Sequence, residues 1–214
     1  MSKIHVIVAS DHAVVRAGLQ RFIDDEHDIN VVAEASTGEQ VYDLFNQLNP
    51  HILLIGCLYS TGMSGVEAVR RILLRHPEAK VIVYTLHDDL AFAGFTLNSG
   101  VKGLITGLTD TDELVKAIRK VAIGKVYISS NVAQKIAIES LSGHDNPIKK
   151  LSTREFEMFR LLAEGCSVKD ISAILNVASK TVANYQTSIK DKLDIHSPVD
   201  IVRLAIKYDV ITVH

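Results

Sequence analysis

The sequence predicts a doubly wound α/β domain with a five-stranded parallel sheet, followed by a smaller all-α domain of four helices. In the first ~140 residues, short β-branched runs alternate with longer amphipathic stretches, which is typical of a parallel sheet covered on both faces. A polar, turn-rich break runs from Ser142 to Pro147. Beyond Leu151 the pattern is helical, with no strand before the last few residues.

Strands and helices alternate five times in the first zone. The predicted strands are Ile4–Ala9, Ile29–Glu34, Ile52–Ile55, Val81–Thr85 and Gly103–Thr106. The predicted helices span residues 13–23, 38–48, 65–75, 89–98 and 110–122. In a doubly wound sheet, the functional crevice lies at the carboxyl ends of the strands, near the point where the strand order reverses. We therefore expect the functional side chains of this domain at the carboxyl ends of the strands, near that point.

Composition and charge exclude several classes of protein. Apolar residues make up 47% of the 214 residues and the formal net charge is −2, which excludes a disordered chain. The longest apolar stretches, such as Ile52–Ile55, fall far short of the ~20 residues that cross a bilayer, so no membrane partner is expected. The start of the chain lacks a signal-peptide pattern, and Cys57 and Cys166 lack metal-binding spacing. These features predict a cytoplasmic protein with reduced cysteines.

Composition breaks divide the chain into three parts. We predict the α/β domain at residues 1–125, a helix and linker at 126–150, and the helical domain at 151–214. Val132–Leu141 is the expected helix before the linker.

Capping residues mark the four helices of the last domain. Serine with an acid three residues later is a capping box, glycine ends helices, and proline suits a first turn. The marks are Ser152 with Glu155 and then Gly165 for the first helix, Ser167 with Asp170 for the second, Ser179 for the third and Pro198 for the fourth.

The second and third of these helices, joined by the turn Asn176–Ser179, have the pattern of a helix-turn-helix. At 100° per residue, a stripe of about 60° on the third helix faces the core. That stripe holds Val182, Gln186, Ile189 and Leu193, and the opposite side holds Lys180, Ala183, Asn184, Thr187, Ser188 and Asp191. Small and amide side chains flanked by lysines suit a DNA major groove, since amides pair with base edges and lysines hold phosphates. The alternative is a solvated face of a small helical domain.

Several motifs of this domain resemble the LuxR-type DNA-binding domain: Leu151–Glu155, Leu161–Gly165, Lys169–Ile171, Lys180–Val182, and Lys192 with Leu193 and Ile195. By position, the resemblance implies that Ala183, Asn184 and Thr187 read bases. It further implies that the DNA backbone is held by Lys180, Thr181, Tyr185, Ser188 and Lys192. This sequence departs from the family at Ala178, where serine is usual, and at Ala183 and Thr187, where a basic residue is frequent.

The charge of this domain favours dimeric binding. Residues 151–214 hold eight Lys/Arg and eight Asp/Glu, so their formal charge is zero, whereas a DNA-binding module is usually basic. We expect weak non-specific affinity and a need for dimerisation. Pro198–Tyr208 carries more apolar residues than one helix side can hide in so small a domain: Val199, Ile201, Val202, Leu204, Ala205 and Ile206. Part of this surface is expected to form a two-fold homodimer interface.

The first zone resembles the receiver domain of NarL/FixJ-class response regulators across residues 1–122. The motifs are Asp11 with His12 after the first strand, Gly65–Ala68, Thr85 after the fourth strand, and Ser99–Gly103. The resemblance implies a phosphorylated carboxylate at the end of strand three, two acids after strand one that hold Mg²⁺ with it, and a lysine after strand five. A hard cation prefers oxygen anions, and it neutralises the transferred phosphoryl group.

This receiver lacks most of that chemistry. The acceptor position is Gly56, the first metal-holding acid is Ser10, the lysine is Gly107, and Leu104 stands where an aromatic residue is common. Asp11 and Thr85 match the family, and one carboxylate alone is a poor Mg²⁺ site. The sequence therefore predicts a receiver that cannot be phosphorylated, in which Asp11 is a helix N-cap and Thr85 a strand-end hydroxyl.

Taken together, these motifs predict an atypical, orphan transcription regulator of two-component type that binds double-stranded DNA as a homodimer, in the cytoplasm and on the nucleoid. The sequence shows no Gly-rich phosphate loop, Ser/His/Asp spacing or paired catalytic acids, so we expect no enzyme activity, metal or cofactor. Two alternatives stay open. One is an interaction protein that titrates a related response regulator through heterodimers, and the other is a receiver that senses a small ligand in the emptied acidic pocket.

Overall fold

The structure is a computed structural model that describes residues 3–56, 63–85, 97, 99–106, 111–141, 146–175, 177–208 and 210–211. These described residues divide into two compact units, the first ending at Ser130 and the second beginning at Asn131. Most of the predicted helix 89–98, the position of Gly107 and most of the predicted linker lie outside the described residues.

A parallel sheet forms the centre of the first unit. Its strands are β1 (Ile4–Ala9), β2 (Ile29–Ala35), β3 (Ile52–Gly56), β4 (Val81–Thr85), β5 (Gly103–Thr106) and β6 (Tyr127–Ile128), in the order β2-β1-β3-β4-β5-β6. The predicted count of five strands is therefore wrong by one. Strand β6 has two residues, too few for a hydrophobic pattern, and its register along β5 comes from Tyr127 N–H donating to the Lys102 carbonyl.

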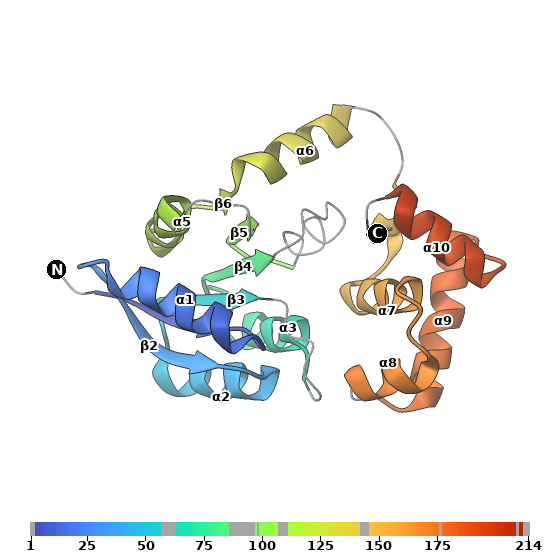
Figure 1. Cartoon of the computed structure of the whole chain (residues 1–214), viewed down its shortest axis with the longest axis horizontal. Helices are drawn as coiled ribbons and strands as arrows, with labels where there is room; N and C mark the ends of the chain where they lie inside the picture. Colours follow the sequence, from blue (N-terminus) through green and yellow to red (C-terminus); the bar gives the residue numbers. More distant parts are fainter. Residues whose placement is uncertain are drawn as a thin grey trace. The chain divides into compact units, whose positions relative to one another are not determined.

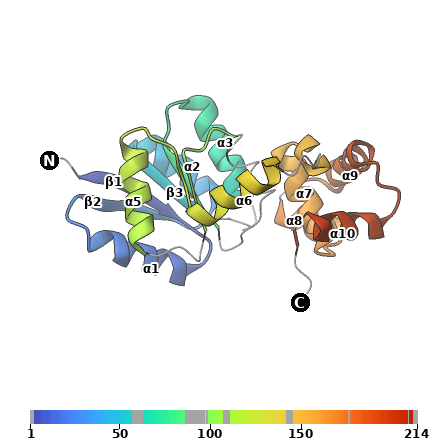
Figure 2. The same cartoon turned by 90° about the horizontal axis from the view of Figure 1, so that it is seen from above.

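Helices cover both faces of this sheet. Helices α1 (Ala13–Asp24) and α5 (Thr111–Ala122) lie on one face, and α2 (Gly38–Leu48) and α3 (Gly65–Arg75) lie on the other (Figure 1 and Figure 2). Because the sheet is buried on both faces, its strands are continuous apolar runs. In Ile52–Ile55, for example, every residue is at most 1% exposed. The chain order 2-1-3 puts the switch point between β1 and β3, so their carboxyl ends form the crevice edge.

The second unit is helical. It contains α6 (Ser130–Leu141), the 3₁₀ turn η1 (Pro147–Lys150), α7 (Thr153–Ala163), α8 (Val168–Ile174), α9 (Ser179–Leu193) and α10 (Pro198–Lys207). Ser130, the first residue of α6, is the last residue of the first unit. The four predicted helices of this domain are present as α7 to α10, and they pack around Phe159 and Met158, both fully buried. Ile148 of η1 is part of this core, so the packed unit begins before Leu151. No helix within the described ranges is long and apolar enough to span a membrane.

The capping prediction is confirmed at three of four helix starts. Ser152 with Glu155 and Ser167 with Asp170 both form reciprocal capping boxes, and Pro198 lies in the first turn of α10. Gly165, with φ +84°, follows the C-cap of α7 in the left-handed conformation, so glycine is the residue that fits there.

The predicted cap of α9 is wrong. Helix α9 begins at Ser179, and its N-cap is Ala178, with φ −63° and ψ 144° and no side-chain hydrogen bond. Ser179 is already helical, so its hydroxyl lies past the position from which a cap reaches the second and third amides. Ala178 has nearly the same dihedrals as the capping Ser167, which has φ −70° and ψ 161°.

We expect the substitution Ala178→Ser to stabilise α9 by about 1 kcal/mol, because its backbone is already in a capping conformation. Amide hydrogen exchange in the first turn of α9 should slow about fivefold. Ser179→Ala, one residue later, should leave exchange nearly unchanged. Equal effects of the two substitutions would show that the helix begins elsewhere.

Candidate functional site

The crevice edge of the sheet brings Ser10 and Gly56 together. Gly56 is the last residue of β3, and Ile55 pairs with Ala9 at the end of β1. A Cβ added at Gly56 would lie 3.7 Å from both Cβ and Oγ of Ser10 and 3.6 Å from the Ala9 carbonyl oxygen. These are ordinary van der Waals distances, so a Cβ fits at this position.

Ser10 is buried and its polar groups have partners. Its hydroxyl accepts from the His12 amide at 3.2 Å, at the start of α1. Its carbonyl accepts from Arg16 Nη1 at 2.7 Å, and Arg16 Nε donates to Glu34 Oε2 at 3.1 Å. Arg16 is a residue that sequence reasoning missed, because nothing in its spacing from Ser10 or Glu34 indicates that it turns back to the sheet edge.

The two family-like residues lie at the same edge. Asp11 follows β1 with its side chain 24% exposed, and its Oδ1 lies 3.9 Å from His12 Nε2. Thr85 ends β4 and is buried. The N-cap of α1 is His12, so the prediction that Asp11 caps this helix is wrong. Gly107 and the turn after Gly56, residues 57–62, lie outside the described residues.

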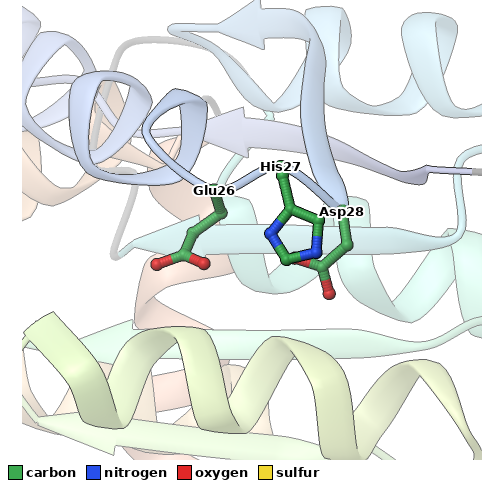
Figure 3. Close-up of side chains that lie close together, drawn as sticks. All are labelled: Glu26, His27 and Asp28. Atoms are coloured by element: carbon green, nitrogen blue, oxygen red, sulfur yellow. The ribbon is translucent and has the colours of Figure 1, made fainter.

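A second group of polar side chains lies in the turn between α1 and β2. Glu26, His27 and Asp28 each have a side-chain N or O atom that could bind a metal ion, and these atoms lie within 4.8 Å of one another. Both carboxylates point toward α5 in Figure 3. Arg119 of α5 donates to both oxygens of Asp28, at 2.9 and 2.6 Å, and to Glu26 Oε2 at 2.6 Å. The hydrogen bonds from Arg119 lower the pKa of Asp28 to about 2. The guanidinium holds both carboxylates, so this cluster braces α5 against the turn.

The helix-turn-helix of the second unit consists of α8 and α9. The two helices pack together, and Ile171 of α8 and Val182 of α9 share the fully buried core. The turn is stabilised by the Val177 amide, which donates to the Ser172 carbonyl, and by the Ser172 hydroxyl, which donates to the Val177 carbonyl. Asn176 lies outside the described residues.

Burial separates two sides of α9 as predicted, except at Ser188, which was predicted on the exposed side but is half-buried because its hydroxyl donates to Glu155. Val182, Ile189 and Leu193 are buried and Gln186 is half-buried. The opposite side, within an arc of about 100°, is exposed. We call its five residues the outer face of α9: Lys180, Ala183, Asn184, Thr187 and Asp191. Of the other residues implied to contact DNA, Thr181, Tyr185 and Ser188 are half-buried on the flanks, and Tyr185 packs against the core.

Glu155, in the first turn of α7, holds the flank of α9. Its Oε2 accepts from Lys192 Nζ at 2.6 Å, and its Oε1 accepts from Ser188 Oγ at 2.6 Å. Burial raises the pKa of Glu155, but these hydrogen bonds and those from Ser152 outweigh it and lower the pKa to about 2. The neighbouring Arg154 donates from Nη1 to Glu157 and from Nη2 to the Leu175 carbonyl, which follows α8. The first turn of α7 therefore holds both helices of the helix-turn-helix.

We expect Glu155→Gln to destabilise the second unit by about 1–2 kcal/mol at pH 7, a value reduced because Lys192 is partly exposed. Since the folded-state pKa is lowered from its ordinary 4.5 to about 2, this stabilisation is present above pH 5 and is lost as the pH falls toward 2. Urea unfolding followed by circular dichroism at several pH values measures it. The control is Asp191→Asn, an exposed carboxylate on α9. A stability difference that persists unchanged at pH 2 would contradict this account.

Helix α10 has two apolar sides. Ile201 and Ala205 are buried in the core, whereas Val199, Val202 and Ile206 are 57%, 37% and 40% exposed. The spacing of 3 and 4 residues places these three on one side of the helix. We call them the α10 stripe. The expectation that the domain core leaves part of this helix's apolar surface uncovered is confirmed.

Comparison with known proteins decides the family. A model of the response regulator receiver domain matches residues 6–119, and a model of the bacterial regulatory proteins of the luxR family matches residues 149–205. The chain belongs to the response regulators with a LuxR-type DNA-binding domain. This response regulator is 34% identical over 210 residues to the response regulator GacA of Pseudomonas aeruginosa, covering 97% of this chain and 98% of GacA. It is 32% identical over 207 residues to the response regulator UvrY of Escherichia coli K12, covering 96% and 94%.

Solved structures support the fold of this response regulator. RcsB of Salmonella enterica serovar Typhimurium, bound to the promoter rprA in the presence of the phosphomimetic BeF3−, has a TM-score of 0.72 at 24% identity, covering 95% of this chain and 98% of that chain. A LuxR-family two-component response regulator from Aurantimonas has a TM-score of 0.62 at 33% identity, covering 65% of this chain and 99% of that one.

Proposed function

We propose that this response regulator is an atypical, orphan transcription regulator, which binds DNA as a homodimer on the cytoplasmic nucleoid while its receiver works without phosphorylation. The observation that carries the proposal is Gly56 at the end of β3, where the family resemblance implies the phosphorylated carboxylate. The outer face of α9 is the proposed DNA-reading surface, with Thr181, Tyr185, Ser188 and Lys192 on its flanks.

The charge distribution supports DNA binding better than the net charge does. Five acids of the helical domain are engaged within it: Glu155, Glu157 and Glu164 pair with Lys192, Arg154 and Arg160, and Asp170 and Asp200 hold helix caps. Each of the three ion pairs removes one cation and one acid, so five Lys/Arg and five Asp/Glu of residues 151–214 lie outside these pairs and the balance stays zero. Lys169 and Lys180 are exposed near the start of the helix-turn-helix and of α9. The place of Lys180 on the outer face of α9, and not the net charge, supports DNA binding over a titrating interaction protein. A gel-shift titration against genomic fragments separates the two functions, since a titrating protein binds none.

The residues at the sheet edge support a receiver without phosphoryl chemistry. The family's Mg²⁺ is held by carboxylates, but Gly56 has no side chain and the Ser10 hydroxyl already accepts from the His12 amide. Asp11 is then the one carboxylate from the three positions that the resemblance assigns to the metal. Such a ligand set does not fit a hard cation, which prefers several anionic oxygens.

Phosphoryl-donor chemistry tests the proposal directly. The full chain is incubated with acetyl phosphate, or with beryllofluoride, and Mg²⁺, and its mobility on a phosphate-affinity gel and its sedimentation are compared with untreated protein. We expect neither to change. Stoichiometric labelling would overturn the proposal and would require an acceptor other than Gly56.

Two substitutions on the outer face of α9 distinguish base reading from phosphate contact. Asn184→Ala should weaken binding to the preferred site by about 1–3 kcal/mol with little loss on random DNA. Lys180→Ala should weaken both and reduce the salt dependence by about one ion. Fluorescence anisotropy at several salt concentrations measures both. Lys192→Ala is a poorer probe, because it also removes the partner of buried Glu155. Equal losses for Asn184→Ala on both DNAs would show that another face reads DNA.

A further inference from the structure

The bases that α9 reads follow from three side chains of its outer face, and this inference rests on the proposed function. A recognition helix contacts base edges with its N-terminal residues. On the outer face, Lys180, Ala183, Asn184 and Thr187 lie in the first nine residues of the fifteen-residue helix, and Asp191 lies one turn later. Of these four, the family resemblance assigns Ala183, Asn184 and Thr187 to the bases and Lys180 to the DNA backbone.

Thr187 presents a methyl group. Its Oγ1 donates to the Ala183 carbonyl at 3.1 Å, so the hydroxyl is turned back toward the preceding turn of α9 and its proton is used there. Thr187 is exposed, and with its proton used it keeps the Cγ2 methyl and the acceptor lone pairs of Oγ1 for a ligand. Together with the Ala183 methyl, this gives two apolar contacts of the kind that pack on the C5-methyl of thymine.

Asn184 adds an amide on the same face, about 60° around the helix axis from Thr187 and about 100° from Ala183. An amide both donates and accepts, and it pairs with N7 and N6 of adenine in the major groove. Guanine presents two acceptors there, N7 and O6, which need a two-donor partner such as arginine or lysine.

Three lysines lie near these residues: Lys192 on one flank, the half-buried Lys190 on the other, and Lys180 on the outer face, which the family resemblance assigns to the DNA backbone. The Lys192 ammonium lies on the flank and donates to Glu155, which also accepts from the Ser188 hydroxyl. Of the five residues of the outer face, Lys180 is the one cation, and it precedes Ala183 by almost one turn. The Asp191 carboxylate, one turn beyond Thr187, is an acceptor and so adds no donor for the N7 and O6 atoms of guanine.

We infer that α9 reads A·T base pairs, with adenine against Asn184 and thymine methyl groups against Thr187 and Ala183. The full chain is tested first by selection from a duplex library with a random centre. Recovered half-sites should be enriched in A·T pairs at two or three adjacent positions. Enrichment of guanine at these positions would overturn the inference while leaving DNA binding intact. Recovery of no duplex would overturn the proposed function and the inference with it.

Base analogues then test the individual contacts in the selected site. Replacing the thymine assigned to Thr187 by deoxyuridine removes one methyl and should weaken binding about threefold to fourfold, the size expected for one buried methyl. The matched variant Thr187→Ser keeps the hydroxyl and loses the methyl, so deoxyuridine should then have no further effect. Replacing the adenine by 7-deazaadenine should weaken the wild type about 5-fold or more and leave Asn184→Ala unaffected. Equal analogue effects in wild type and variants would overturn the assignment.

Discussion

Replacing Gly56 by aspartate alone should leave the receiver unable to accept a phosphoryl group efficiently. A Cβ at this position would meet the described neighbours no closer than 3.6 Å, which is ordinary van der Waals contact. The obstacle is chemical: Ser10 offers a neutral hydroxyl to a cation, and Gly107 offers no positive charge to the phosphoryl group. A divalent cation and a positioned lysine each contribute on the order of 100-fold or more to such a transfer. Acetyl phosphate labelling of Gly56→Asp should therefore stay at background.

The triple variant Ser10→Asp, Gly56→Asp, Gly107→Lys is the matched test of that reasoning. It restores the residue types that the family resemblance implies, and we expect it to label where the single variant does not. Thermal unfolding of both variants, compared with wild type, checks that each remains folded. Efficient labelling of Gly56→Asp alone would show that Asp11 suffices to hold the cation, which contradicts the electrostatic account.

The substitution Val202→Asp should abolish dimerisation through the helical domain and weaken specific DNA binding by about 100-fold or more. Val202 is the middle residue of the α10 stripe, and a carboxylate there would be desolvated in a two-fold interface. Loss of the second half-site removes the avidity that linked sites provide, about 100-fold to 10,000-fold. Sedimentation and gel-shift titration of the full chain measure the two effects.

The control for this prediction is Val202→Ile, which keeps the α10 stripe apolar and should bind like wild type. Because Val202 is 37% exposed in the single chain, neither substitution should unfold the domain, and circular dichroism verifies that. A Val202→Asp protein that still binds the full site with wild-type affinity would show that the dimer forms through another surface.

Much of the fold could be predicted from local patterns. Helices α2 and α3 have the predicted bounds, and α1 and β3 each extend one residue beyond them. In each of these elements the hydrophobic pattern extends over several residues, so it can be detected in the local sequence. Strand β6 has two residues and depends on its register with β5. The start of α9 depends on the backbone conformation of Ala178, because alanine carries no capping group that a pattern could detect.

The same distinction holds for the candidate sites: features set by local periodicity could be predicted, and contacts set by long-range packing could not. The exposed side of α9 follows from its period, so Lys180, Ala183, Asn184 and Thr187 were placed on one face correctly. The partners of Lys192 and Ser188 could not be predicted, since Glu155 lies 37 and 33 residues away and contacts them only through the packing of α7 on α9. Arg16 at the crevice edge is similar, because its two partners come from different strand ends.

The bonds made by the first turn of α7 affect how this DNA-reading element can be exchanged. Arg154 binds the carbonyl after α8, and Glu155 binds two side chains of α9, so part of what orients the two helices lies outside them in sequence. A chimaera that transplants only residues 167–193 into another regulator would leave these contacts behind. Such a graft would carry over the side chains that meet the bases and lose the orientation in which they meet them. Modular swaps of specificity in this protein therefore require a unit that includes Ser152 and the first turn of α7.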